Sequence, residues 1–318
     1  MNQEELISRL YSLGHFDNPA HLTGVTADDV PRLKLHDKEV RTAIASYQEY
    51  FSGQFDALAL EKHGRLGIAD GESGPATEAL LELPRCGFPD FPVGVMAAGA
   101  QEANWPDACR RNLKFARNFK TAPGLSEEDT NRAFWAPSNN WTYALADLEM
   151  ISVDGATSRG DARIYAGLKS LGGSTLAWSY LARNQCNDWL EQAYDTGRTW
   201  ALAYLATVAS HEVGHAIGLP HNRDQDALMY PSIHSRSIAR RGYPNATDLA
   251  QAKGLGYALS GSQPPSIDDV YRPRPHVPPD GPDDPDPPTD SYWFSGGFTL
   301  MDGEKPVGKF ILTPKPEV

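Results

Sequence analysis

Apolar residues recur at helical spacing through the first quarter of the chain. One stretch runs from Glu4 to Leu13, a second covers residues 40–47, and a third covers Thr77–Leu83 after the turn-rich residues 70–75. Spacings of three and four residues place such side chains on one face of a helix. Residues 1 to about 83 are therefore predicted to be helical. The apolar side chains of the first two stretches are Leu6, Leu10, Leu13, Val40, Ile44 and Tyr47.

The region from about residue 91 to residue 260 mixes two patterns, which predicts helices and strands together. Helical spacing covers Ser126–Ala146 and Thr199–Ile217, and Pro137 is expected to break the first of these helices near its middle. Short apolar runs outside these helices predict strands. The predicted strands are Leu113–Ala116, Leu148–Val153 and Arg163–Ala166.

Prolines and aspartates dominate residues 261–290. Such a composition buries too little apolar surface to fold, so an extended linker is predicted. In residues 291–318, two apolar runs flank an Asp302-Gly303 turn, which predicts strand, turn, strand. Because an isolated hairpin is only marginally stable in water, it is expected to pack on another surface or pair with another chain.

Composition narrows the classes of function. The 318 residues leave room for a complete enzyme core. The net charge of -12 and the sequence pI near 5.2 argue against nucleic acid or an anionic membrane as the main partner. No apolar run is long enough to form a transmembrane segment. The first residues, MNQEEL, lack the basic start and apolar core of a secretory signal, so the export route stays open.

The strongest chemical pattern lies at residues 211–221, which read HEVGHAIGLPH. On a helix, His211 and His215 are one turn apart and project from one face, so both imidazoles can bind one metal ion. Gly218 tolerates positive φ, which lets the chain turn back and bring His221 to the same metal. A chance match at all five fixed positions has a probability on the order of a few in a hundred thousand. The pattern therefore indicates a metal site.

Three neutral imidazoles with one open coordination position are typical of catalytic zinc, because structural zinc sites are usually closed by four protein ligands. Glu212 lies beside His211 in the sequence and can act as general base toward a zinc-activated water. The same carboxyl can then pass the proton to a leaving amine. These residues therefore indicate a zinc-dependent peptidase with one catalytic Zn²⁺ at this motif.

The extended motif resembles that of the metzincin peptidases. Residues 227–231, ALMYP, resemble the methionine turn in its matrixin form. This resemblance implies that Met229 forms an apolar floor under the zinc ligands and that Tyr230 lines a substrate pocket. It also implies an α+β fold, in which a twisted mixed sheet packs on the active-site helix.

Residues 84–90, PRCGFPD, closely resemble the cysteine switch of matrix metalloproteinase propeptides, and they are called the switch segment below. The resemblance implies a latent enzyme in which Cys86 is the fourth zinc ligand, while Arg85 and Asp90 pair and hold the loop. The alternative is that Cys86 is a buried structural cysteine. For Cys109 and Cys186, a disulfide and two separate buried thiols are equally open.

The resemblance weakens at two further ion sites of animal matrixins. Trp178 and Ala193 stand where those proteins carry histidine ligands of a structural zinc, so this second zinc is not expected. Asp195 remains from the adjoining calcium site. Arg198 stands where a glutamate would coordinate, which leaves calcium binding open.

The predicted organisation has four parts: an all-α propeptide over residues 1–90, a catalytic domain over 91–260, a linker over 261–290 and a hairpin segment over 291–318. The propeptide resembles a peptidoglycan-binding bundle. The predicted function is that of a secreted zymogen whose zinc endopeptidase acts on protein or peptide substrates. Secretion is implied by the family resemblance. The competing hypothesis is a protein that binds a cell-wall or matrix polymer through its N-terminal bundle and C-terminal hairpin.

Overall fold

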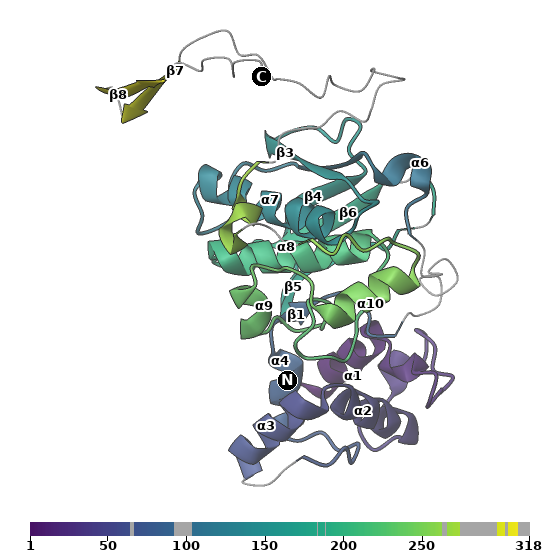
Figure 1. Ribbon diagram of the computed structural model, residues 1–318. Helices are drawn as coiled ribbons and strands as arrows, with labels where there is room; N and C mark the ends of the chain where they lie inside the picture. The colour runs from purple at the N-terminus through teal and green to yellow at the C-terminus, as the bar shows by residue number, and fades with distance from the viewer. Residues whose placement is uncertain are drawn as a thin grey trace. The chain divides into compact units, whose positions relative to one another are not determined.

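Contacts divide the chain into two units, residues 1–276 and 277–318, which are described separately. In the first unit an N-terminal helical bundle is followed by a sheet with its helices (Figure 1). Among the described residues no helix is both long and apolar enough to cross a membrane. The computed structural model describes residues 1–63, 67–91, 104–182, 184–187, 189–262 and 266–273, together with the backbone of 298–302 and 305–310.

The predicted helical region forms a bundle with a hydrophobic core of its own. Its three predicted helices are confirmed as α1, α2 and α4, and apolar side chains such as Leu10 and Ile44 have no exposed surface. Helix α1 begins after Asn2, whose side chain accepts a hydrogen bond from the Glu5 N–H. The apolar pattern does not predict α3, because only two of its side chains are buried. The elements are α1 (Gln3–Ser12), the short 3₁₀ helices η1 (His15–Asp17) and η2 (Val30–Arg32), α2 (Lys38–Tyr50), α3 (Ser52–His63) and α4 (Pro75–Glu82).

Six strands form one mixed sheet in the order β1-β5-β6-β4-β2-β3. Strand β5 is antiparallel to β6, and all other neighbours are parallel. The three predicted strands are confirmed as β2, β3 and β4, whereas β5 and β6 lie outside the predicted strands. Strand β1 belongs to the switch segment, which therefore adds an edge strand to the sheet. The strands are β1 (Arg85–Cys86), β2 (Leu113–Arg117), β3 (Met150–Ala156), β4 (Ile164–Lys169), β5 (Thr175–Ser179) and β6 (Leu190–Asp195).

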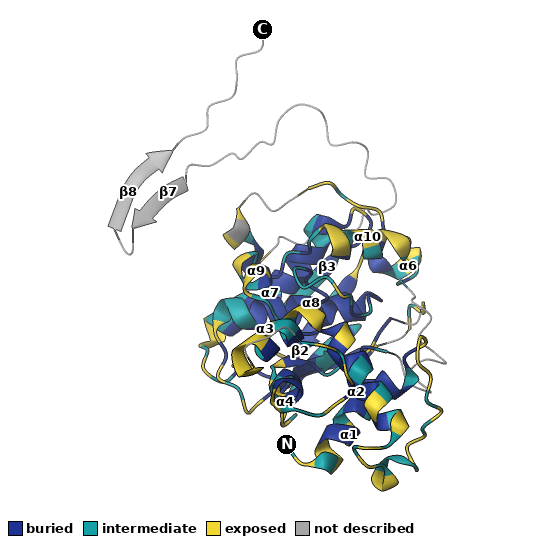
Figure 2. Cartoon of the chain, turned by 90° about the horizontal axis from the view of Figure 1, so that it is seen from below, coloured by how far each residue is buried: buried dark blue, intermediate teal, exposed yellow. Residues whose placement is uncertain are grey.

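Two long helices, α7 and α8, pack on each other. Helix α7 also packs against β3, and α8 packs against β5. Both helices are largely buried (Figure 2). Asn140 and Trp141 of α7 donate hydrogen bonds to the hydroxyl and carbonyl of Ser210 on α8. The expected break at Pro137 is wrong. Helix α7 continues through it, because buried residues on both sides, such as Phe134 and Trp141, hold both halves in the core. The remaining helices of this region are α6 (Asp107–Arg110), α7 (Glu127–Ala144), α8 (Leu202–Ala216), α9 (Ser235–Ala239), α10 (Ala246–Gly254) and the 3₁₀ helix η3 (Ile267–Tyr271).

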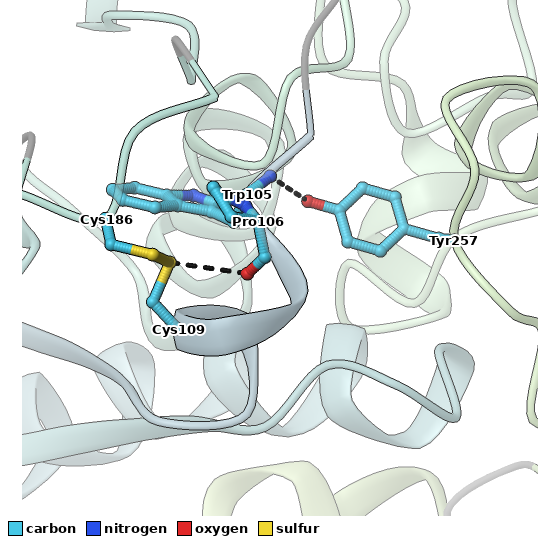
Figure 3. Close-up of a disulfide and its surroundings, with 5 residues drawn as sticks. All are labelled: Trp105, Pro106, Cys109, Cys186 and Tyr257. Carbon is cyan, nitrogen blue, oxygen red and sulfur yellow. Dashed lines mark hydrogen bonds between the residues drawn. A yellow bond between two sulfur atoms is a disulfide. The ribbon is translucent and has the colours of Figure 1, made fainter.

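The beginning of the sheet region is tied to the end of α8. Cys109 and Cys186 form a disulfide beside Trp105 (Figure 3), so the first of the two open alternatives holds. The Trp105 indole N–H donates to the Ala216 carbonyl at 2.8 Å, and the Tyr257 hydroxyl donates to the next carbonyl at 3.0 Å. The last carbonyls of a helix have no partner within it. These bonds therefore fix the end of the helix that carries two of the candidate ligands.

Part of the predicted linker is folded. Ile267–Tyr271 forms η3, and Val270 and Tyr271 are buried in the core beside α7. These two apolar side chains give the stretch the buried surface that the Pro/Asp tract lacks. Residues 274–297 lie outside the described part, so the linker prediction remains a prediction there. In the second unit β7 (Phe298–Asp302) and β8 (Lys305–Phe310) pair antiparallel, as the hairpin pattern predicts.

A substitution at Gly214 can test how tightly α8 is packed. A Cβ at this position would overlap the Met229 sulfur and lie 3.1 Å from the Trp141 ring. We expect Gly214→Ala to lower the free energy of unfolding by about 1–3 kcal/mol, although alanine is the better helix former. Gly254→Ala in α10 is the matched control, since a Cβ there meets nothing within 4 Å, and it should stabilise by up to about 1 kcal/mol. Urea unfolding compares the two, and a stabilised Gly214→Ala would contradict the packing.

Candidate metal centre

Helix α8 and the turn after it bring three histidines together. His211 and His215 lie one turn apart on α8, and neither has exposed surface. The helix ends at Ala216, and Gly218 has a φ of 104°, in the left-handed region that favours glycine. The chain turns there, as the sequence predicts. The His221 ring returns to within 5.3 and 4.8 Å of the two helical rings, between centroids.

Four candidate ligand atoms converge, namely one nitrogen of each histidine and the sulfur of Cys86, and all lie within 4.8 Å of one another. The Nε2 atoms of His211 and His221 are 3.3 Å apart, and Cys86 Sγ is 3.5 Å from His215 Nε2. Tetrahedral zinc with its usual bond lengths separates two nitrogens by about 3.3 Å and a nitrogen from a sulfur by about 3.6 Å. The residues therefore fit Zn²⁺. No second group of this kind occurs in the part of the chain that the structure describes.

The second nitrogen of each imidazole is held by an acceptor. Because a carbonyl or carboxylate oxygen only accepts, each bond keeps the proton on Nδ1 and leaves the Nε2 lone pair free. Burial lowers the pKa of each imidazole, and lowers that of His211 to about 3, so the rings are neutral. The bonds run from His211 to the Leu228 carbonyl at 2.7 Å, from His215 to the Leu219 carbonyl at 2.7 Å, and from His221 to the Asp90 carboxylate at 3.0 Å.

Cys86 reaches the centre because its segment lies as β1 at the edge of the sheet. The Gly87 N–H donates to the Ala177 carbonyl on β5, and the Cys86 N–H donates to the Pro231 carbonyl on the other side, both at 2.8 Å. A Cβ on Gly87 would lie 2.8 Å from the Thr175 side chain, so this close approach requires glycine. Burial raises the pKa of the Cys86 thiol well above its ordinary value. A thiolate at this position therefore requires a neighbouring cation.

Glu212 is a buried carboxyl without a hydrogen-bond partner. It has no exposed surface, and neither oxygen has a partner among the described residues. Burial raises the pKa of Glu212 to about 8, although the neighbouring Cys86 thiol lowers it in part. Burying a polar group without a partner is costly, and such groups concentrate at functional sites. Beside a cluster of metal ligands, this carboxyl is free to accept a proton.

The switch segment contains the predicted pair of Arg85 and Asp90. An Arg85 guanidinium nitrogen lies 2.6 Å from Asp90 Oδ1, and both side chains are buried. Burial raises the pKa of Asp90, but the Arg85 charge and hydrogen bonds from two histidines hold it well below its usual range. The two histidines are His15 of the bundle and the candidate ligand His221. Sequence reasoning missed both contacts. His15 lies 75 positions and His221 lies 131 positions from Asp90 in the sequence, and no local pattern links residues so far apart.

The predicted methionine turn passes beside α8. Met229 is completely buried and lies against Gly214. The N–H groups of Leu228 and Met229 donate to the Asp248 carboxylate at 2.8 and 2.9 Å, which ties the turn to α10. Sequence reasoning did not identify Asp248. The signal that could have found it is the capping box that Asn245 and Asp248 form at the start of α10.

Tyr230, the predicted wall of a substrate pocket, is covered by the N-terminal bundle. Its ring lies 5.6 Å from the Phe51 ring, and its hydroxyl donates to Gln54 at 3.2 Å. Nearby, the Arg223 guanidinium lies 5.0 Å from the centre of the Tyr50 ring. The junction of α2 and α3 therefore occupies the surface next to the methionine turn.

Side chains occupy the positions where the sequence loses the two additional ion sites. The Lys169 ammonium group lies 5.2 Å from the centre of the Trp178 ring. The Arg198 guanidinium lies 3.5 Å from the Asp195 carboxylate and donates to the Gly173 carbonyl at 2.9 Å. A protein cation thus stands beside the remaining acidic residue.

The sequence around this centre is similar to that of known proteins. The Matrixin family model matches residues 124–250, which contain α8, the three histidines and the methionine turn. Residues 124–250 belong to the matrixin family. Matrix metalloproteinase-18 of Xenopus laevis is 31% identical to this chain over 172 residues, which cover 51% of the chain and 35% of the relative. Metalloendoproteinase 4-MMP of Arabidopsis thaliana is 26% identical over 255 residues, which cover 69% of the chain and 71% of the relative.

Matrix metalloproteinase-20 of Homo sapiens is 28% identical over 177 residues, or 51% of the chain and 34% of that protein. The chain thus spans about a third of the length of these two animal relatives and about 71% of the plant relative. The family model does not include Cys86. The link between Cys86 and the three histidines therefore rests on the geometry of this chain.

Removal of one helical imidazole tests the centre. We expect the wild-type chain to bind a single Zn²⁺. His211→Ala should weaken zinc binding by more than about 100-fold, because a lost ligand costs more than a lost partner of a ligand. His234→Ala is the matched control, since His234 caps α9 outside the cluster. Competition with a chromogenic chelator measures both affinities, and equal values would contradict the site.

Proposed function

We propose that this chain is a zinc-dependent endopeptidase made as a latent zymogen, with residues 1–90 as its propeptide. The observation that carries the proposal is the convergence of three imidazoles and the Cys86 thiol beside the unpartnered carboxyl of Glu212. Three of the four donors come from the sheet region and the fourth from the propeptide. One coordination position is therefore vacated when the propeptide leaves, as a catalytic zinc site requires.

In the proposed reaction a bound Zn²⁺ supplies Lewis acidity, which polarises the scissile carbonyl and makes water a better nucleophile. His211, His215 and His221 hold the ion through nitrogens whose rings are oriented by hydrogen bonds at Nδ1. Glu212 accepts a proton from the attacking water and donates it to the leaving amine. Its carboxyl has no hydrogen-bond partner among the described residues of the latent chain, so it is available to take and release a proton in this reaction.

The substrate is proposed to bind where the switch segment now lies. The Ala177 and Pro231 carbonyls accept hydrogen bonds from that segment, and a peptide in extended form can use the same acceptors. The Phe88 ring packs on the His215 ring, with centroids 4.4 Å apart, so the cleft accepts an aromatic side chain. Because the segment continues on both sides of Cys86, the cleft accommodates the interior of a chain. This favours an endopeptidase over an exopeptidase.

Protein or peptide substrates outside the cell are the proposed targets. The disulfide of Cys109 and Cys186 supports this location, because disulfides persist mainly in oxidising compartments. Calcium is not needed to balance Asp195, since Arg198 already neutralises that carboxylate. A bound calcium ion would have to displace the guanidinium.

A cavity in the N-terminal bundle favours a second candidate function, the binding of a cell-wall or matrix polymer. The cavity has a volume of about 210 Å³ and shares no residue with the metal centre. Its lining includes apolar Phe55 and Ile68 together with polar Asp70, Glu72 and Thr77. Such a mixed lining suits a sugar or a peptide. Polymer binding would then localise the zymogen and is compatible with peptidase activity.

The role of Glu212 is tested in the enzyme freed from its propeptide. Glu212→Gln keeps the size of the side chain but removes the base, so kcat should fall by roughly 10²–10⁴ while zinc content is unchanged. Glu191→Gln on β6 is the matched control, because Glu191 pairs with Lys169 outside the centre. Hydrolysis of a peptide library and zinc analysis give both readouts. Turnover near that of the wild type would rule out Glu212 as the base.

The role of Cys86 is tested in the uncleaved chain. Cys86→Ala removes the sulfur ligand and should convert a silent zymogen into one with measurable peptidase activity. That activity should stay below the activity of the processed enzyme, because the hydrogen bonds of the switch segment to Ala177 and Pro231 remain. The double variant Cys86→Ala/Glu212→Gln is the control for contaminating proteases. A silent Cys86→Ala chain that nevertheless binds peptidoglycan would favour the polymer-binding alternative.

A further inference from the structure

The three candidate zinc ligands differ in what holds their second nitrogen. His211 and His215 donate to backbone carbonyls of the sheet region, which remain after the propeptide is removed. His221 donates instead to the carboxylate of Asp90, which belongs to the propeptide. Of these ligands, only His221 depends on the propeptide for its hydrogen bond.

Asp90 uses both carboxylate oxygens and has no exposed side-chain surface. Oδ1 accepts from Arg85 at 2.6 Å and from His221 at 3.0 Å, and Oδ2 accepts from His15 Nε2 at 3.0 Å. Arg85 supplies the balancing positive charge, so both imidazoles can donate as neutral groups. Charge-assisted hydrogen bonds from three sides fix the orientation of the carboxylate.

His15 orients that carboxylate from within the bundle. It is completely buried in η1, and its Nδ1 lies 2.9 Å from the Ser46 hydroxyl, which accepts a hydrogen bond from the Asn18 amide at 2.8 Å. Ser46 therefore donates its own proton to Nδ1, which leaves the Nε2–H of His15 for Asp90. A continuous chain of hydrogen bonds runs from Asn18 to His221. The rings that enclose the imidazole edge-on are those of Tyr47, Tyr50 and Phe91.

We propose that Asp90, oriented by His15, is a positioning residue for the zinc ligand His221, so that the latent chain retains zinc more tightly than the processed enzyme does. This inference rests on the proposed zinc site. A carboxylate partner fixes the ring of a ligating histidine and raises its basicity, and loss of such a partner costs about 10–100-fold in metal affinity. Departure of the propeptide removes this partner from His221 and leaves the other two imidazoles unchanged.

The contribution of Asp90 has to be separated from that of the Cys86 sulfur. The test therefore uses the uncleaved Cys86→Ser chain as its background. Affinity for Zn²⁺ is measured by competition with a chromogenic chelator in this chain and after addition of Asp90→Ala, Asp90→Asn or His15→Phe. Asp161→Ala is the matched control, since Asp161 is an exposed carboxylate that pairs with Lys114.

We expect Asp90→Ala to lower the zinc affinity by about 10–100-fold and Asp161→Ala to leave it unchanged. Asp90→Asn separates the hydrogen bond from the ion pair, because its amide oxygen still accepts from His221 but does not neutralise Arg85. It should retain most of the affinity that Asp90→Ala loses. His15→Phe should cause a smaller loss in the same direction. Equal losses in the Ala and Asn variants, or no loss in either, would overturn the proposal.

Two further measurements cover the case in which Asp90→Ala fails to fold. In proton NMR of Asp90→Asn, the Nδ1 proton signal of His221 should shift, while the signals of His211 and His215 stay in place. The processed enzyme should bind zinc less tightly than the uncleaved Cys86→Ser chain, and equal affinities would overturn the proposal. A wild-type chain that binds no zinc would count against the proposed function instead, so the two failures are distinguishable.

Discussion

A buried cluster of three imidazoles, a thiol and a carboxyl lies where the elements of the centre meet, and its thiol can ionise there only beside a cation. Burial lowers the pKa of His211 and raises the pKa values of Cys86 and Glu212, which drives each group toward its neutral form. A divalent ion gives the nitrogen lone pairs a shared partner and stabilises the thiolate. The elements that meet here are α8, the turn at Gly218 and β1, and a bound cation would connect all three.

The propeptide does more than cover this centre. It adds β1 to the sheet, packs Phe51 on Tyr230 and supplies Asp90 to His221. Each contact joins the N-terminal region to the sheet region at or beside the centre. In the proposed zymogen, latency is therefore distributed over a backbone ladder, an aromatic contact and a buried carboxylate as well as the sulfur. Removal of the sulfur alone leaves the other three contacts in place.

Features encoded within a few residues could be predicted from the sequence. The ligand pair on α8, the turn at Gly218 and the Arg85–Asp90 pair all fall within short segments. The resemblance of residues 84–90 to a known switch extended the prediction to Cys86. Strand β6 was missed because Gln192 is buried in it and interrupts the apolar pattern. The contacts of His15 with Asp90 depend on tertiary packing of distant segments, which local spacing does not encode.

Among the described residues, Cys86 and the three histidines are the one group of this kind that could hold a metal ion. At the calcium position the guanidinium of Arg198 lies beside Asp195 and bonds to the Gly173 carbonyl, so a covalently attached cation joins that loop to the end of β6. At the position of the second zinc, Trp178 packs against the Lys169 ammonium group instead of ligating an ion. At both positions the described side chains contact other protein groups. Under the proposed function, zinc affinity is set by the groups around the three histidines, and of these groups both Cys86 and Asp90 leave with the propeptide.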